Sequence, residues 1–264
     1  GGFSTHDASI AYFRGQENFK LIEYTITFFM ILGGTNFVVH FRVLSGKISS
    51  LWNSMEMKLW FGILGLATSL IMMEAGIFGE TLEGLFRNTI FQVASIATTT
   101  GFETKAISQF GAAAQQIFLM LMVVGGCVSS TGGGLKVGRI GIMLKGIWNR
   151  IKRSSRPKEM LTPLLIDEEK VGVGELERIF VIFSTWIFLL AIGGLVTALL
   201  SPLGAFQAFS GMFSALGNIG PSYIPLDQMV VLHPFIKIFY MFAMLVGRLE
   251  ILPIFILLNR EVWR

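Results

Sequence analysis

The sequence predicts an all-α membrane protein built from repeated units, each with a long apolar span, a short apolar helix and a second long span. Three observations carry this prediction. Only 14% of the 264 residues are charged and 53% are hydrophobic, whereas roughly a quarter of a soluble domain is charged. Long and short apolar stretches alternate, and the short ones end in similar glycine motifs. This composition argues against a soluble enzyme, a nucleic-acid binder and a disordered chain.

The long apolar stretches approach the roughly 20 residues that a helix needs to cross a bilayer. Five candidate spans follow from this criterion: 21–41, 57–73, 111–129, 179–200 and 234–258. The clearest is 179–200, which contains no charged residue. Glu23 and His40 lie near the ends of the first stretch, which favours an interfacial position for both.

Two further apolar stretches, 85–97 and 205–216, are too short to span. A helix of such a length covers roughly 20 Å, about two-thirds of the hydrocarbon core. Each is either a buried or interfacial amphipathic helix, or a re-entrant half-helix that enters and leaves on one side. Irregular backbone at membrane depth requires burial or a water-filled cavity. The recurrence of the pattern favours the re-entrant interpretation.

The recurrence is an internal repeat. When Gly101 is aligned with Gly220, Ser95 falls on Ser214, and each unit reads as span, short helix, glycine motif and span. The chain opens on Gly-Gly-Phe-Ser followed by one span, which resembles the second half of an earlier copy. Because the first residue is Gly1, we expect the chain to be a piece of a longer protein. Internal repeats decide the fold class before any single motif does.

Charge sets the expected orientation. Residues 136–158 contain many Lys and Arg residues and no acid, and Arg260 and Arg264 lie near the C-terminus. The loops around the glycine motifs carry Glu74, Glu80, Glu83 and Glu103. Cytoplasmic loops of membrane proteins are enriched in Lys and Arg. We therefore expect a multi-pass protein whose C-terminus and basic linkers face the cytoplasm, with the glycine motifs on the outer side.

The glycine motifs have the composition of a carbonyl-lined ion site. Rings of backbone carbonyls replace the water shell of an ion in selective pores, and glycine adopts the unusual dihedral angles that this requires. Thr99, Thr100 and Gly101 would present carbonyls while Phe102 packs behind them. In the second motif Asn218, Ile219 and Gly220 would do the same, and Pro221 would fix the chain as it leaves. The alternative is that each glycine is an ordinary helix C-cap.

The stretch 125–134 interrupts an otherwise good span. Five of its ten residues are glycine and three carry hydroxyls, and each glycine inside a helix costs about 1 kcal/mol relative to alanine. The alternative is a close helix–helix contact through small residues. We favour a broken helix, in which the hydroxyls satisfy the exposed backbone groups.

Arg248 lies in the middle of the last expected span, where a charge is costly and by default functional. Glu250 is two residues away and does not share its helical face. Arg248 is either half of a buried ion pair with another carboxylate or a fixed positive charge near an ion pathway.

Together these motifs resemble the Trk/Ktr/HKT superfamily of cation transporters, and most closely the potassium uptake membrane subunits of its bacterial Trk systems. The motifs that carry the resemblance are residues 1–10, 98–102, 125–136, 214–221 and 247–250. The family has four membrane–pore–membrane repeats with re-entrant pore helices around one K⁺ pathway, as in K⁺ channels. The resemblance implies that residues 1–55 end the second repeat with a filter strand, one transmembrane helix and a cytoplasmic linker. Residues 56–158 and 159–264 would form the third and fourth repeats.

The resemblance also implies roles for individual residues. The expected selectivity filter comprises Gly1, Gly2, Phe3, Thr99, Thr100, Gly101, Phe102, Asn218, Ile219, Gly220 and Pro221. K⁺ would be held by backbone carbonyls of Thr99, Thr100, Gly101, Asn218, Ile219 and Gly220. The expected gate is an intramembrane loop with an arginine: Gly125, Gly126, Ser129, Ser130, Thr131, Gly132, Gly133, Gly134 and Arg248.

The implied function is K⁺ uptake across a bacterial cytoplasmic (inner) membrane by the pore-forming subunit, with symport as one mode and K⁺ as the transported ion. The alternative is Na⁺/K⁺ transport by a Ktr/HKT-like relative. No cofactor is expected in the chain. The expected partners are membrane lipid, a second copy in a homodimer and a cytoplasmic nucleotide-binding regulatory subunit of the TrkA type, with no nucleic acid.

An enzyme is not expected. Covalent chemistry needs a nucleophile–base pair, a metal constellation or a phosphate cradle, and the sequence offers three histidines and one cysteine without metal-ligand spacing. A degenerate scaffold subunit is a third possibility, against which the intact glycine motifs argue.

Overall fold

Helices make up most of the chain. The computed structural model describes residues 4–75, 81–154, 164–167, 169–249, 253–254 and 256. The first elements are η1 (Ser9–Gly15), α1 (Phe19–Gly34), α2 (Phe37–Leu44), α3 (Ser50–Asn53), α4 (Met55–Ala75) and α5 (Leu82–Ala97). They are followed by η2 (Ile107–Gln109), α6 (Ala112–Val124) and α7 (Val137–Ser154). A hairpin of β1 (Leu165–Ile166) and antiparallel β2 (Glu169–Lys170) leads to α8 (Val173–Leu200), α9 (Ala205–Gly217), α10 (Leu226–Val231) and α11 (Pro234–Leu249).

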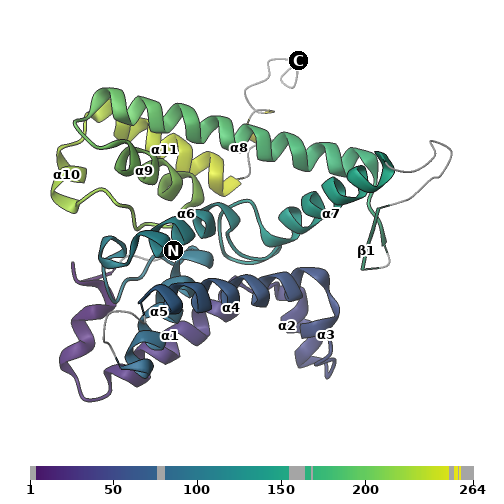
Figure 1. Ribbon diagram of the computed structural model, residues 1–264, viewed down its shortest axis with the longest axis horizontal. Coiled ribbons are helices and arrows are strands. Elements are labelled where there is room, and N and C mark those ends of the chain that lie inside the picture. The colour runs from purple at the N-terminus through teal and green to yellow at the C-terminus, as the bar shows by residue number, and fades with distance from the viewer. Residues whose placement is uncertain are drawn as a thin grey trace.

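The helices form two layers, each with its own apolar core. Helices α8, α9 and α11 lie on one side and α1, α4 and α5 on the other, with α6 and α7 between them (Figure 1). One cluster of buried side chains comes mainly from α4, α5 and α6, with Trp60 and Phe118 fully buried. The other comes mainly from α8, α9 and α11, with Met212 and Ile236 fully buried. One layer thus combines α1 with α4 and α5, and the other holds α8, α9 and α11.

Two of the five expected spans are continuous helices. The stretch 57–73 lies within α4 and 179–200 within α8, and both helices are long and apolar enough to cross a membrane. The expected span 21–41 is not one continuous helix: α1 and α2 are long and apolar enough only together, and they are bent by 103°. Thr35 is extended, and the Asn36 side chain caps α2 by accepting a hydrogen bond from Val38 N at 2.9 Å. The chain therefore begins a second, capped helix in a new direction at Asn36, although the apolar pattern of the sequence continues through this point.

The other two expected spans are shorter than the sequence suggests. Within 111–129 only α6 is helical, because the helix stops at Val124 before the glycines. Within 234–258 the structure describes α11, of 16 residues, and most of the remainder lies outside the described residues. At 1.5 Å per residue, α11 is about 24 Å long.

The two short helices are buried inside their layers. In α5 every residue from Phe91 to Ala97 is buried, and in α9 the last turn is buried as well. Helix α5 packs against α1, α4 and α6, and α9 packs against α8, α11 and α6. The first halves of both helices carry exposed side chains, such as Phe86 and Phe206, so burial is nearly continuous only in their C-terminal halves.

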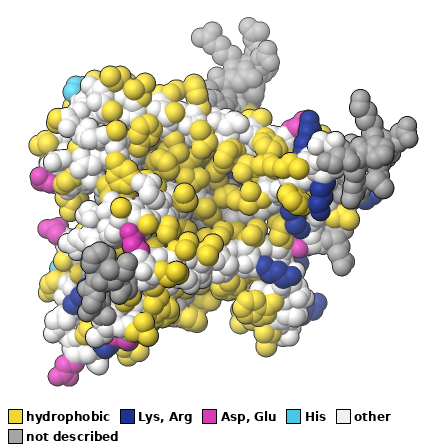
Figure 2. All heavy atoms as spheres, in the orientation of Figure 1, with side chains coloured by type: hydrophobic (Ala, Val, Ile, Leu, Met, Phe, Trp, Pro, Cys, Tyr) yellow, Lys and Arg dark blue, Asp and Glu magenta, His cyan; other side chains and the backbone are white. Residues whose placement is uncertain are grey.

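Charge is unequal between the two ends of the molecule. Hydrophobic side chains cover the middle of the face in Figure 2, and most Lys and Arg side chains on that face lie at the end of α3, α7 and the hairpin. More of the Asp and Glu side chains lie at the opposite end. Large apolar side chains between these ends, such as Phe28, Leu66 and Phe188, are exposed.

Candidate functional site

Both buried short helices lead into loops with left-handed backbone. After α5, Thr99 and Gly101 have φ of +56° and +83°, and after α9, Asn218 and Gly220 have φ of +55° and +110°. Left-handed dihedrals are uncommon outside glycine. The C-caps of the helices are Thr98 and Asn218, so neither glycine is the C-cap. The glycines serve the loops beyond the helix ends instead.

A serine holds each loop from the same place in the repeat. Ser95 Oγ donates to the carbonyl oxygen of Phe102 at 2.6 Å, and its own carbonyl accepts from Thr100 N at 2.9 Å. Ser214 Oγ accepts from Gly220 N at 3.1 Å, and its carbonyl accepts from Ile219 N at 3.0 Å. These are the serines that the internal repeat aligns, so the repeat extends to the contacts that shape the loops.

The two loops lie side by side. A Cβ atom added to Gly101 would collide with the carbonyl oxygen of Ile219 and lie 3.3 Å from Pro221 Cδ. A Cβ atom added to Gly220 would lie 3.8 Å from Gly101 Cα. Such close backbone approach is a position that only glycine fits. The expected filter segments of two repeats are therefore neighbours, although they are far apart in the sequence.

Residues 125–136 form an irregular segment between α6 and α7, which we call the glycine loop. Gly125 and Gly134 have φ of +69° and +76°. The loop returns to its own start, because Leu135 N donates to Val123 O at 3.1 Å and Lys136 N donates to Val124 O at 2.9 Å. The small residues of 125–134 therefore form a loop that closes on itself. They do not form a contact between two continuous helices.

The glycine loop lies across the ends of both short helices. Gly133 N donates to Thr99 Oγ1 at 2.8 Å in a buried hydrogen bond. A Cβ atom on Gly133 would collide with the carbonyl oxygen of Gly217, and one on Gly132 would lie 3.1 Å from Thr98 O. The backbone of the glycine loop therefore contacts the residues just after α5 and the last residue of α9. Larger side chains in the loop would prevent these contacts.

Two cationic side chains bind carbonyl groups of the glycine loop. Arg248 Nη1 on α11 donates to Thr131 O at 2.6 Å, and Lys136 Nζ donates to Gly132 O. Among the described residues, Arg248 makes no ion pair with a carboxylate, which leaves its charge beside the loop. The structure thus brings the expected gate residues together, and it connects them to the loop after α5.

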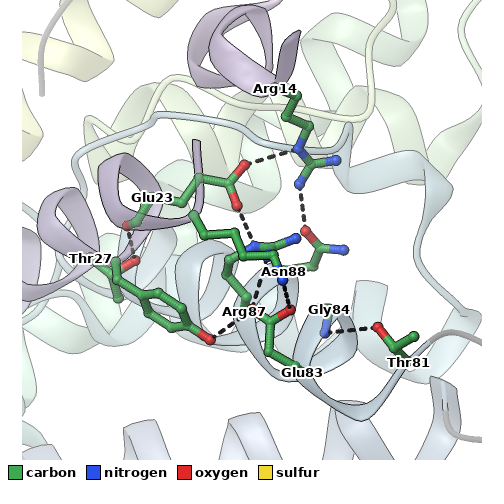
Figure 3. A network of polar contacts seen from close by, with 10 residues as sticks. Arg14, Glu23, Thr27, Thr81, Glu83, Gly84, Arg87 and Asn88 are labelled. Atoms are coloured by element: carbon green, nitrogen blue, oxygen red, sulfur yellow. Dashed lines mark hydrogen bonds and ion pairs between the residues drawn. The ribbon is translucent and has the colours of Figure 1, made fainter. Parts of the chain in front are cut away.

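A buried network of ion pairs joins α5 to α1 and η1 (Figure 3). The Glu23 carboxylate accepts from Arg14 Nε at 2.9 Å and from Arg87 Nε at 2.7 Å, and Arg87 Nη1 also donates to Glu83 at 2.9 Å. The Glu23 side chain is only 1% exposed. The charge of Glu23 is thus neutralised inside the protein by two arginines from other segments, and its interfacial depth in the membrane stays a prediction. An acid and an arginine within apolar stretches are the sequence signals that could have indicated the pair.

The segment at the start of the chain reaches the loop after Gly101. Ile10 N donates to Glu103 O at 3.1 Å, and Glu103 N donates to Ser9 Oγ at 3.1 Å. Burial raises the pKa of the Glu103 carboxyl. The expected filter residues Gly1, Gly2 and Phe3 lie outside the described residues.

The match to known proteins covers almost the entire chain. The TrkH family, described as cation transport proteins, matches residues 1–77 and 81–262. This chain belongs to the TrkH family. The family is one of membrane transporters rather than of enzymes, and its members match the all-α fold that the sequence predicts.

Relatives within the TrkH family are similar over the whole chain. The Trk system potassium uptake protein TrkH of Salmonella typhimurium is 31% identical over 269 residues, which are 100% of this chain and 54% of the relative. TrkH of Halomonas elongata is 32% identical over 279 residues, with the same coverage. The crystal structure of the potassium transporter TrkH from Vibrio parahaemolyticus superposes with a TM-score of 0.86 at 27% identity, covering 100% of this chain and 56% of that one. The chain spans about half the length of these relatives.

Proposed function

We propose that this chain forms part of the K⁺ pore of a Trk-type uptake protein in the bacterial cytoplasmic membrane. The observation that carries the proposal is the backbone contact between the loops after α5 and α9, at Gly101 and Ile219. Family membership adds support, because the relatives named above are potassium uptake proteins. K⁺ is the transported ion, and the chain needs no cofactor for this role.

The proposed filter selects ions through backbone oxygens. A K⁺ ion entering the pore loses water and gains carbonyl oxygens in its place. In this chain the carbonyls come from Thr99, Thr100 and Gly101 in one repeat and from Asn218, Ile219 and Gly220 in the next. Phe102 and Pro221 hold the ends of these loops, and Gly1, Gly2 and Phe3 supply a further corner. Left-handed backbone at alternate positions suits a row of carbonyls that point to one axis.

The proposed gate is the glycine loop with Arg248. The loop spans the ends of both pore helices, which is where it blocks an ion leaving the filter. The Arg248 guanidinium adds a positive charge beside it, and a charge in a low-dielectric region repels cations strongly. Conduction requires the loop to move and the Arg248–Thr131 hydrogen bond to break.

The proposed architecture has three parts: residues 1–55, 56–158 and 159–264, as the end of a second repeat and complete third and fourth repeats. Helices α5 and α9 are its re-entrant pore helices. The basic end of the molecule in Figure 2 supports a multi-pass topology with that end and the C-terminus in the cytoplasm. The same end suits a cytoplasmic nucleotide-binding subunit of the TrkA type, and family resemblance supports a homodimer surrounded by membrane lipid.

Ion flux in liposomes tests the proposed function. The complete protein is reconstituted, and uptake driven by a K⁺ gradient is compared with uptake driven by an equal Na⁺ gradient, with empty liposomes as the background. We expect K⁺ flux well above Na⁺ flux. Equal fluxes would favour the Na⁺/K⁺ transport of a Ktr/HKT-like relative, and no flux of either ion would favour a scaffold subunit.

A further inference from the structure

Glu56 ties three segments together at the cytoplasm-proximal end of α4. Its Oε1 accepts a hydrogen bond from Val128 N of the glycine loop at 2.6 Å. Its Oε2 accepts one from Asn36 Nδ2, at the bend between α1 and α2, at 3.0 Å. Hydrogen bonds to an ionised carboxylate are shorter and stronger than those between neutral groups. One carboxylate therefore anchors an edge of the glycine loop.

Asp167 holds the residue next to Glu56 in the chain. It lies in the turn of the β1–β2 hairpin, with φ of +47°. Its Oδ1 and Oδ2 accept from Met55 N at 2.9 and 3.0 Å. Met55 is the first residue of α4, where unpaired backbone N–H groups and the helix dipole favour a carboxylate. The hairpin and the start of α4 lie at the same end of the molecule (Figure 1).

These contacts surround a cavity of about 340 Å³ that Met55, Glu56, Val128 and Asp167 line together with Glu175 and Arg178. The Asp167 carboxylate of the hairpin accepts a hydrogen bond from the backbone N–H of Met55. The Glu56 carboxylate accepts one from the backbone N–H of Val128 in the glycine loop. Consecutive residues of one rigid helix thus connect a surface hairpin to the loop that crosses the ends of α5 and α9.

We propose that Glu56 and Asp167 form a latch that holds the glycine loop closed and opens when the hairpin moves. This inference rests on the proposed function, because it assigns the glycine loop the role of gate. Both residues are positioning residues, since they act through the loop and touch no ion. Displacement of the hairpin frees Met55, lets the first turn of α4 shift and withdraws the carboxylate from Val128 N. Other anchors of the loop, such as Cys127 N on Gly34 O at 2.9 Å, remain.

Cys127 gives a readout that is independent of transport. It is the single cysteine of this chain, it lies in the glycine loop next to Val128, and it is buried. The experiment uses the complete protein with any cysteine outside this chain replaced, and it measures how fast methyl methanethiosulfonate modifies Cys127. We expect Glu56→Ala and Asp167→Ala to speed the reaction about tenfold, the effect on an opening equilibrium of losing a hydrogen bond to a charged group.

Glu175→Ala is the matched control. It removes a carboxylate that lines the same cavity without bonding the loop or α4, so the Cys127 rate should stay at the wild-type value. Glu56→Gln and Asp167→Asn retain an acceptor and the side-chain shape, and they serve if the alanine variants do not fold. We expect these amides to speed the reaction severalfold, because they lose the charge. Unchanged Cys127 rates in folded variants at both positions would overturn the latch.

K⁺ flux through the same variants separates the latch from the proposed function. Faster modification of Cys127 together with higher basal K⁺ flux supports both the latch and the proposed function. Faster modification with unchanged flux supports the latch and refutes the gate role of the glycine loop. Unchanged modification with normal selective flux supports the proposed function and refutes the latch.

Discussion

At the scale of single residues, Gly101 is where the two filter loops leave no room for a side chain. Its φ is +83°, and a Cβ atom would collide with the Ile219 carbonyl oxygen. Gly101→Ser therefore forces the loops apart and changes the direction of the carbonyls. We expect the ratio of K⁺ to Na⁺ permeability to fall in the complete protein, measured by flux in liposomes.

The control for this change is Gly65→Ala in α4, where a Cβ atom would meet nothing within 4 Å. It should leave the permeability ratio unchanged and keep expression normal. A wild-type ratio for Gly101→Ser at normal expression would instead mean that Gly101 is a structural turn without a role in selection.

Arg248 offers a second test, with outcomes of opposite sign. Arg248→Ala removes the hydrogen bond to Thr131 O and a positive charge beside the glycine loop, which repels cations there. We expect basal K⁺ flux, normalised to the amount of protein, to rise. A normalised flux that stays at the wild-type value while the amount of folded protein falls would indicate a purely structural role for Arg248. Arg42→Ala, an exposed arginine of α2, should change neither quantity.

At the scale of elements, the break at 125–134 was predictable and the bend at Asn36 was not. Five glycines make a continuous helix costly whatever surrounds them, so local sequence decides the break. Residues 21–41 read as one apolar run, and their bend combines the local cap of Asn36 on Val38 N with distant partners. Phe37 N donates to Ser129 O at 3.3 Å, and Asn36 binds Glu56. Periodicity within a window cannot report contacts of this kind.

The same limit explains what the sequence showed of the site. The recurring glycine motifs of the sequence predict the left-handed backbone at the glycines of both filter loops. The hydrogen bond from Gly133 N to Thr99 Oγ1 was not predicted, because only the packing of α5 against α6 brings these segments together. The ion pairs of Glu23 were not predicted for a related reason: Arg14 and Arg87, which neutralise it, lie in other elements.

The Glu23–Arg87 pair gives a prediction for the stability of α5. Both side chains are at most 8% exposed, and removal of one partner of a buried pair costs roughly 3–5 kcal/mol. Arg87→Ala should lower the free energy of unfolding by about that amount, measured by denaturant titration of the complete protein in detergent.

Lys20→Ala is the matched control, because it breaks the exposed pair between Lys20 and Glu83 on the same network. It should leave the unfolding midpoint almost unchanged, since exposed pairs contribute little. Equal effects of Arg87→Ala and Lys20→Ala would show that the buried pair does not support α5.

The orientation of α7 is tested by Lys152, one of its exposed lysines. Lys152 lies near the end of this helix at the basic end of the molecule, which the positive-inside rule assigns to the cytoplasm. A membrane-impermeant amine reagent should modify Lys152 in inside-out vesicles and leave it unmodified in intact cells. Modification from outside intact cells would reverse the proposed topology.

At the scale of the whole molecule, the two layers of Figure 1 repeat one plan. Helices α4 and α5 in one layer correspond to α8 and α9 in the other, and each short helix ends at the boundary between the layers, where Gly101 meets Ile219. The sequence predicts the repeat, because the serines and glycines recur in register. It does not predict how closely the backbones of the two loops approach at Gly101 and Ile219, since that contact needs both loops folded.

This plan predicts that the 264-residue chain alone carries no selective K⁺ current. A carbonyl ring of four corners needs four pore helices, and the described residues contain two, α5 and α9, in a chain that spans 54% of the relatives' length. The chain as proposed supplies three of the four corners, and the first of these, at Gly1, Gly2 and Phe3, lacks its pore helix. An incomplete ring leaves an ion partly without oxygen ligands, so that dehydration costs more than the site returns. The measurement is K⁺ and Na⁺ flux in liposomes that hold the 264-residue chain, beside liposomes that hold the complete protein at equal density. A robust K⁺-selective flux from the 264-residue chain alone would refute the four-repeat arrangement, because three corners would then suffice or copies of the chain would assemble the ring between them.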